Sequence, residues 1–141
     1  MGEREKRQFV RGMTLLELLI VVAIIGVLSS IVYPSYSQHV RKGHRQQAIT
    51  DMTRIQLHLE SNYQQGYDTA PFIDNGICQD FCTVDKSRYT ISVVSSTSSY
   101  TITATPLANS GQDKDQCAGE TYSELSLNQL GEMMPAECWR Q

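Results

Sequence analysis

The feature that most constrains this chain is an apolar segment near its N-terminus. From Met13 to Val32, twenty residues contain one charged side chain, Glu17. At about 1.5 Å of rise per residue, a helix of this length crosses a hydrocarbon core of roughly 30 Å. A lone carboxylate in that core costs about 3 kcal/mol on insertion scales, so it needs a partner. The segment therefore predicts a membrane-spanning helix in which Glu17 has a function.

A charged leader precedes this segment and ends in a glycine. Residues 1–12 carry four basic and two acidic side chains, and Gly12 stands directly before the apolar segment. A cleaved secretory signal would instead be cut after the apolar run, near Ser29 and Ser30. A plain single-pass anchor explains the length of the segment but explains neither Gly12 nor Glu17.

This order of leader, glycine, carboxylate and apolar run resembles the N-terminal signal of type IV prepilins. The resemblance implies that a prepilin peptidase cleaves between Gly12 and Met13 and methylates the new amine of Met13. It also implies that Glu17, the fifth residue of the mature chain, pairs during assembly with the terminal amine of another subunit. The alternative is that Glu17 reaches the lipid headgroups from its place near the helix end. Type IV prepilins more often have Phe at the position of Met13.

The apolar segment continues into a stretch with helical periodicity. Five side chains recur at spacings of four, three, four and four residues: Ala48, Met52, Ile55, Leu59 and Tyr63. They share one helical face, which predicts a helix over residues 13–65 that packs under a sheet. A coiled-coil seam is the weaker alternative, because only about two heptads are available. Pro34 predicts a kink in this helix, and Gly66 predicts its end.

The second half of the chain has the patterns of strands. Residues 88–94 and 99–105 alternate between apolar and polar side chains, and residues 95–98 join them, which predicts a hairpin with one face on the helix. Residues 122–130 predict a third strand and have room for a fourth. Residues 64–88 show little periodicity and predict a loop.

Four cysteines all lie in this C-terminal part: Cys78, Cys82, Cys117 and Cys138. An even number of cysteines in a small exported domain indicates two disulfides. A metal site is the weaker alternative, because all three histidines lie upstream of the first cysteine. Four cysteines allow three pairings, and the sequence pattern does not choose among them.

The C-terminal tail extends the resemblance. The run Leu125-Ser-Leu-Asn-Gln-Leu-Gly131 and the terminal Cys138-Trp139 are similar to the tail of minor pilins of the PilE type. The resemblance implies an α+β fold, the type IV pilin fold, in which a long N-terminal helix packs on a small antiparallel sheet. It also implies a C-terminal region closed by a Cys117–Cys138 disulfide, with Cys78–Cys82 as the second bond. The parts that it implies are a cleaved leader (1–12), a membrane and assembly helix (13–33), an amphipathic half of the helix (34–65) and a β head (66–141).

Charge and motifs limit what the head can do. From residue 46 onward the sequence has twelve acidic and five basic side chains, whereas phosphate binding ordinarily uses a basic stripe. No direct nucleic-acid site is therefore evident. The sequence has no catalytic motif, and we expect no enzyme activity, cofactor or metal ion. Asp113-Lys-Asp115 has part of a calcium-loop pattern, but we expect it to be a solvated turn.

The resemblance implies a structural or priming subunit, a minor pilin, that acts in assembly of a type IV pilus and thereby in adhesion, twitching motility or DNA uptake. The partners that it implies are the prepilin peptidase, the major pilin and other minor pilins. We expect a single-pass inner-membrane protein with its head in the periplasm, which then enters an extracellular pilus. The alternatives are a pseudopilin of a type II secretion system and a recognition or adhesin module at the pilus tip.

Overall fold

The computed structural model describes residues 12–140, so residues 1–11 of the expected leader lie outside the described residues. The described chain divides into two units, one ending at Tyr36 and the other beginning at Ser37. One helix, α1 (Leu15–Ser61), belongs to both units and includes Pro34 in its interior. The predicted long helix is therefore confirmed, although it ends four residues before residue 65. The kink at Pro34 stays a prediction.

The first unit is the apolar part of α1, and its side chains are open to the surroundings. Between Met13 and Val32, the exposed fraction of the large apolar side chains runs from 40% at Val21 to 77% at Leu15. Among the described residues, α1 is the one helix that is long and apolar enough to cross a membrane. An apolar surface of this extent is suited to a lipid or to other subunits rather than to water.

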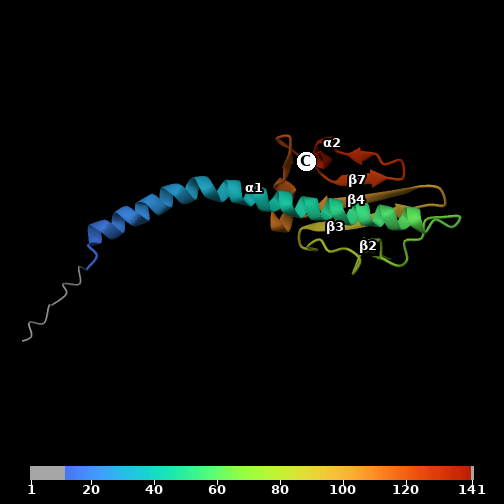
Figure 1. The fold of residues 1–141 in the computed structure, drawn as a ribbon, viewed down its shortest axis with the longest axis horizontal. Coiled ribbons are helices and arrows are strands. Elements are labelled where there is room, and N and C mark those ends of the chain that lie inside the picture. Colours follow the sequence, from blue (N-terminus) through green and yellow to red (C-terminus); the bar gives the residue numbers. More distant parts are fainter. Residues whose placement is uncertain (1–11, 141) are drawn as a thin grey trace, which may run out of the picture. The chain divides into compact units, whose positions relative to one another are not determined.

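The second unit is built on a six-stranded antiparallel sheet (Figure 1). In the order of the sheet, its strands are β1 (Ile73–Asp74), β2 (Ile77–Cys78), β3 (Tyr89–Ser95), β4 (Tyr100–Pro106), β7 (Leu125–Asn128) and β8 (Met133–Met134). The remaining elements are the 3-10 turns η1 (Ala108–Ser110) and η2 (Gln112–Lys114), the two-stranded sheet of β5 (Gln116–Cys117) and β6 (Glu120–Thr121), and the short helix α2 (Ala136–Trp139).

The centre of the sheet is the predicted hairpin. β3 and β4 pair along their whole length, from Tyr89 opposite Pro106 to Ser95 opposite Tyr100. β7 then pairs with the other edge of β4, with Ala104 opposite Leu125. The period-two pattern is seen directly in the burial, because alternate residues of these three strands face the core. The hairpin and the third strand are thus confirmed.

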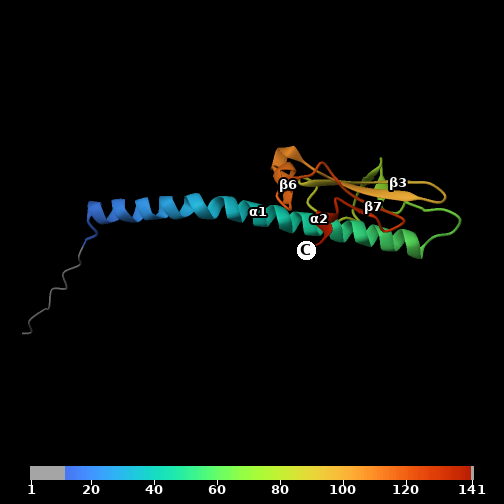
Figure 2. The same cartoon turned by 90° about the horizontal axis from the view of Figure 1, so that it is seen from above.

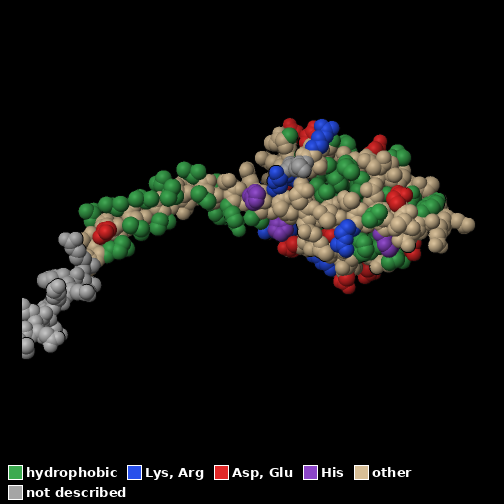
Figure 3. Space-filling view, viewed as in Figure 1, with side chains coloured by type: hydrophobic (Ala, Val, Ile, Leu, Met, Phe, Trp, Pro, Cys, Tyr) green, Lys and Arg blue, Asp and Glu red, His purple; other side chains and the backbone are tan. Residues whose placement is uncertain are grey.

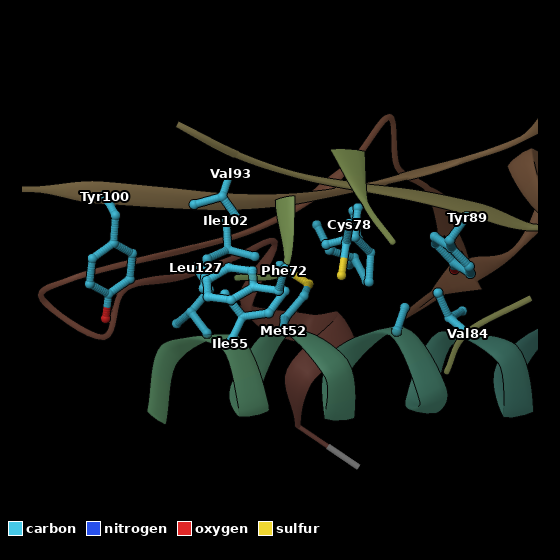
Figure 4. Packing of buried hydrophobic residues seen from close by; sticks show 14 of the residues in the cluster. Met52, Ile55, Phe72, Cys78, Val84, Tyr89, Val93, Tyr100, Ile102 and Leu127 are labelled. Atoms are coloured by element: carbon cyan, nitrogen blue, oxygen red, sulfur yellow. The ribbon is translucent and has the colours of Figure 1, made fainter. Parts of the chain in front are cut away.

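The core lies between this sheet and one face of α1, which Figure 2 shows as two layers. Ala48, Met52, Ile55 and Leu59 of the helix are all at most 1% exposed. In Figure 4, Met52 and Ile55 lie beside Phe72, Ile102 and Leu127 in the space between helix and sheet. The predicted helical stripe is confirmed except at its last member: Tyr63 follows the end of α1 and is 49% exposed.

Two short hairpins were not predicted. In the first, β1 and β2 are joined by Asn75 and Gly76, with φ of 51° and 79°. In the second, β5 and β6 are joined by Ala118 and Gly119, with φ of 53° and 88°. Two successive residues with positive φ form the tight turn whose twist matches antiparallel strands. The prediction that residues 64–88 form only a loop is therefore wrong at residues 73–78.

Candidate processing and assembly site

The candidate processing site is the start of α1. Gly12 and Met13 precede the helix, Met13 is 61% exposed, and a side chain at residue 12 would meet no described atom within 4 Å apart from its neighbours in the chain. The peptide bond between them is therefore outside regular structure and uncrowded by the described residues. These are the conditions that a peptidase needs to bind a bond in extended form.

The backbone of Glu17 takes part in capping this helix. Its N–H donates to Oγ1 of Thr14 at 3.2 Å, and the N–H of Leu18 donates to the Thr14 carbonyl at 3.2 Å. Thr14 is thus the N-cap, and Glu17 is the third residue of the first turn, where the helix dipole favours a carboxylate. This second role was not predicted, although the Thr-x-x-Glu spacing of residues 14–17 is typical of a helix N-terminus.

The side chain of Glu17 has no cation beside it in the described chain. Among residues 12–140, the ion pairs are Arg45–Asp115 and Arg54–Asp51. The carboxylate therefore lies in a long apolar surface with its charge available to a group outside residues 12–140.

A buried ion pair joins the helix to the loop after β4. Arg45 Nη1 lies 2.7 Å from Asp115 Oδ2, and these side chains are 1% and 4% exposed. Arg45 also donates to the carbonyl of Gln116 at 3.0 Å. A charge this deeply buried is tolerated when it is paired and hydrogen-bonded. The expectation that Asp113-Lys-Asp115 is a solvated turn is wrong for Asp115, because its carboxylate neutralises the buried guanidinium.

Two tyrosines extend this buried network. Tyr122 donates to Asp115 Oδ2 at 2.7 Å, and its hydroxyl lies 2.5 Å from that of Tyr89. Burial is the main cause that raises the pKa of both phenols, and the hydrogen bond to Asp115 raises that of Tyr122 further. The amide of Gln112 donates to the Tyr89 hydroxyl at 3.1 Å and to the Arg41 carbonyl of α1 at 3.0 Å. Both phenols therefore stay neutral at physiological pH.

A buried carboxylate fastens the loop before β3. Asp51 is fully buried, and its Oδ2 accepts the backbone N–H groups of Thr83 and Val84, each at 2.7 Å. Arg54 lies 3.4 Å from its other oxygen. Hydrogen bonds to a carboxylate are among the stronger ones in proteins. Asp51 therefore ties residues 83–84 to the same helix that carries the core stripe.

The four cysteines form two disulfides. Cys78 is bonded to Cys82 with a Cα–Cα distance of 6.0 Å, and Cys117 to Cys138 with a Cα–Cα distance of 5.0 Å. These are the pairs that the resemblance implied. The second bond joins β5 to α2, so it connects the small sheet to the C-terminal end of the described chain.

These features define a class of protein. An exposed apolar helix that continues under an antiparallel sheet, with a disulfide across the C-terminal region, is the type IV pilin fold. The family model described as "Type IV minor pilin ComP, DNA uptake sequence receptor" matches residues 34–121, and the chain belongs to this family. A second model, the prokaryotic N-terminal methylation motif, matches residues 7–33. The chain is thus a minor pilin with a prepilin-type N-terminus.

Relatives come from both pili and secretion systems. The chain is 34% identical over 73 residues to type II secretion system core protein G of Dickeya chrysanthemi, which is 52% of this chain and 46% of that protein. It is 28% identical over 86 residues to a fimbrial protein of Dichelobacter nodosus, 60% of this chain and 52% of the other. It is 27% identical over 111 residues to a type IV major fimbrial protein FimA of the same organism, 76% and 63%. The chain thus spans about half the length of the first of these relatives, and no solved structure matches it.

Proposed function

We propose that this minor pilin is a priming or structural subunit of a type IV pilus that enters the filament after cleavage between Gly12 and Met13. The observation that carries this proposal is the carboxylate of Glu17 in an otherwise uncharged, exposed apolar segment directly after Gly12. The exposed, non-helical peptide bond after Gly12 is the proposed substrate of the prepilin peptidase. Methylation of Met13 keeps its amine cationic.

The chemistry of the proposed assembly step is the pairing of two costly charges. In hydrocarbon, the Glu17 carboxylate and the Met13 amine each carry a desolvation penalty of several kcal/mol. When the amine of one subunit lies beside the carboxylate of its neighbour, each charge offsets part of the penalty of the other. The pair therefore favours docking in a single register. The partners proposed for this step are the major pilin and the other minor pilins.

The location proposed for the subunit rests on its apolar helix and its disulfides. The exposed apolar helix holds the subunit in the inner membrane before assembly, and the two disulfides suit a head that folds on the oxidising, periplasmic side. The pilus then carries the subunit to the cell exterior.

The test separates the charge of Glu17 from its capping role. Glu17→Ala removes the carboxylate, and we expect a protein that still inserts in the membrane but is depleted at least tenfold from sheared pili. Thr14→Ala is the matched control, because it removes the helix cap that Oγ1 provides and leaves the charge in place. Normal incorporation of Glu17→Ala, or equal depletion of both variants, would show that the carboxylate is not an assembly contact.

A second candidate function comes from the description of the family, which names a receptor for a DNA uptake sequence. In this chain the head has few cations that could bind the phosphates of DNA. The sequence has no Lys or Arg between Arg54 and Lys86, between Arg88 and Lys114, or between Lys114 and Arg140. DNA binding draws most of its affinity from cations at the phosphates. The cations that the head does have are few, so we expect it to bind duplex DNA weakly, with an affinity that falls steeply as salt is raised.

The third candidate function is that of a secretion pseudopilin, which the relatives in type II secretion systems raise. Deleting the gene separates a pilus subunit from a secretion pseudopilin. Loss of surface pili with normal enzyme secretion supports the role in the pilus. Loss of secretion with normal pili would mean that the proposed pairing of Glu17 with a terminal amine serves assembly of the secretion filament instead.

A further inference from the structure

The basic side chains of the second unit are unevenly distributed. Figure 3 shows no Lys or Arg on the right-hand half of that unit, where carboxylates and uncharged side chains cover the surface. Five basic residues come from three segments that meet beside the start of this unit: Arg41, Lys42, Lys86, Arg88 and Lys114. We call these five residues the basic collar. Its three lysines are exposed, and its two arginines are half-buried.

Direct contacts hold the three segments of the collar together. η2, which ends at Lys114, lies against α1 because Gln112 donates to the Arg41 carbonyl at 3.0 Å. Arg88 reaches back to the carbonyl of Ser110 in η1, at 3.5 Å. The segment that leads to Lys86 is tied to α1 by the hydrogen bonds of residues 83–84 to Asp51. The collar is thus a built surface rather than a feature of the sequence alone.

The acidic groups at this surface do not cancel it. The nearby carboxylates are Asp85 and Asp113, with Glu120 at the start of β6, and His44 of α1 lines the same hollow as Asp85. Asp85 is engaged by the hydroxyl and N–H of Ser87, at 2.7 Å and 2.8 Å, and these bonds are the main cause that lowers its pKa. Asp85 therefore stays ionised, and these three carboxylates offset three of the five collar cations, which leaves a net charge of +2. Arg41 Nε is buried without a hydrogen-bond partner among the described residues.

We propose that the basic collar binds the phosphates of anionic phospholipids in the membrane that holds the apolar segment. Arg41 follows Val32 by nine residues. Such a connection spans about 14 Å as a helix and at most roughly 30 Å when extended, so the collar stays within reach of the headgroups. Lysine and arginine side chains at this depth bring their charge to the phosphates while their methylenes remain against apolar surface. The acidic remainder of the head is repelled by the same lipids, which directs the collar toward the membrane.

This proposal rests on the membrane-bound stage of the proposed function, and the lysine amines allow a direct test. The mature full-length chain is reconstituted into vesicles of phosphatidylcholine alone, or of equal parts phosphatidylcholine and phosphatidylglycerol. Acetylation rates of Lys42, Lys86 and Lys114 are then measured by mass spectrometry. We expect all three to react at least threefold more slowly in the anionic vesicles, and the protection to disappear at high salt. Flotation with the neutral vesicles reports membrane anchoring separately from lipid charge.

Arg54 provides the matched control, since it lies on the same helix outside the collar and is 47% exposed. In Arg54→Lys the reporter amine should react at the same rate in both lipids. A variant with Arg41→Gln and Arg88→Gln should lose protection at the three collar lysines, whereas Arg54→Gln should not. Equal rates in the two lipids would overturn the proposal. Slow acetylation of the three lysines that is equal in the two lipids would indicate contact with a second copy of the chain instead.

Discussion

The buried pair of Arg45 and Asp115 gives the sharpest prediction about the head. Removing one partner leaves the other charge buried without compensation, which typically costs about 3–5 kcal/mol. This range applies to the pair because the two side chains are 1% and 4% exposed and their contact is 2.7 Å. We therefore expect Arg45→Met and Asp115→Asn each to lower the free energy of unfolding by about 4 kcal/mol.

The double variant separates the pair from its surroundings. Arg45→Met together with Asp115→Asn leaves no unpaired buried charge, so its cost should fall short of the sum of the two single costs by about 1–3 kcal/mol. Arg54→Met is the control for an ion pair with one exposed partner, because Arg54 is 47% exposed and 3.4 Å from Asp51, which keeps its backbone hydrogen bonds. That variant should lose no more than about 1 kcal/mol.

The assay is urea unfolding of the mature chain in detergent, followed by the fluorescence of Trp139. This is the single tryptophan of the sequence, and it lies in the second unit, where its Nε1 donates to the Met134 carbonyl at 3.3 Å. The signal therefore reports on the head rather than on the apolar helix. Strict additivity of the two single variants would refute the argument that Arg45 and Asp115 stabilise the head as a pair.

The other predictions use the same unfolding assay. Cys138→Ser opens a 21-residue loop and should cost about 3 kcal/mol, against about 2 kcal/mol for the four-residue loop opened by Cys82→Ser, and a reversed order would contradict the loop-entropy reasoning. Because burial raises the pKa of Tyr122 above its usual value of 10, the folded state resists ionisation. Stability should then fall as the pH rises above about 10, and Tyr122→Phe should lose less of it over that range than the parent chain. Asp51→Asn weakens the acceptor of two backbone N–H groups and should cost about 2 kcal/mol, whereas a cost near zero would mean that the loop before β3 is held elsewhere.

The regular elements of the fold were predictable because their periodicity is strong. The spacing from Ala48 to Leu59 predicted the helical face that packs on the sheet, and the alternation in β3 and β4 predicted the central hairpin. The short strands were missed because two residues are too few to show a period. The dipeptide Asn75-Gly76 could nevertheless have predicted the first short hairpin, since it favours the turn with positive φ at both positions.

The polar interior was not predicted, because charged side chains ordinarily lie at the surface. Arg45 extends the helical stripe by three residues ahead of Ala48, and Asp51 lies three residues beyond it. Both positions therefore face the core, and a charge at such a position predicts a buried partner. Which residue is the partner of Arg45 could not be predicted, because Asp115 is 70 residues away in the sequence. No local pattern relates two residues so far apart.

The most direct test of the central proposal is the mass of the mature chain in assembled filaments. Pili are sheared from cells and digested, and the N-terminal peptide of this subunit is identified by mass spectrometry. The account predicts a chain that begins at Met13 with one methyl group on its terminal amine. An intact leader, or a chain that begins after Ser30, would contradict it.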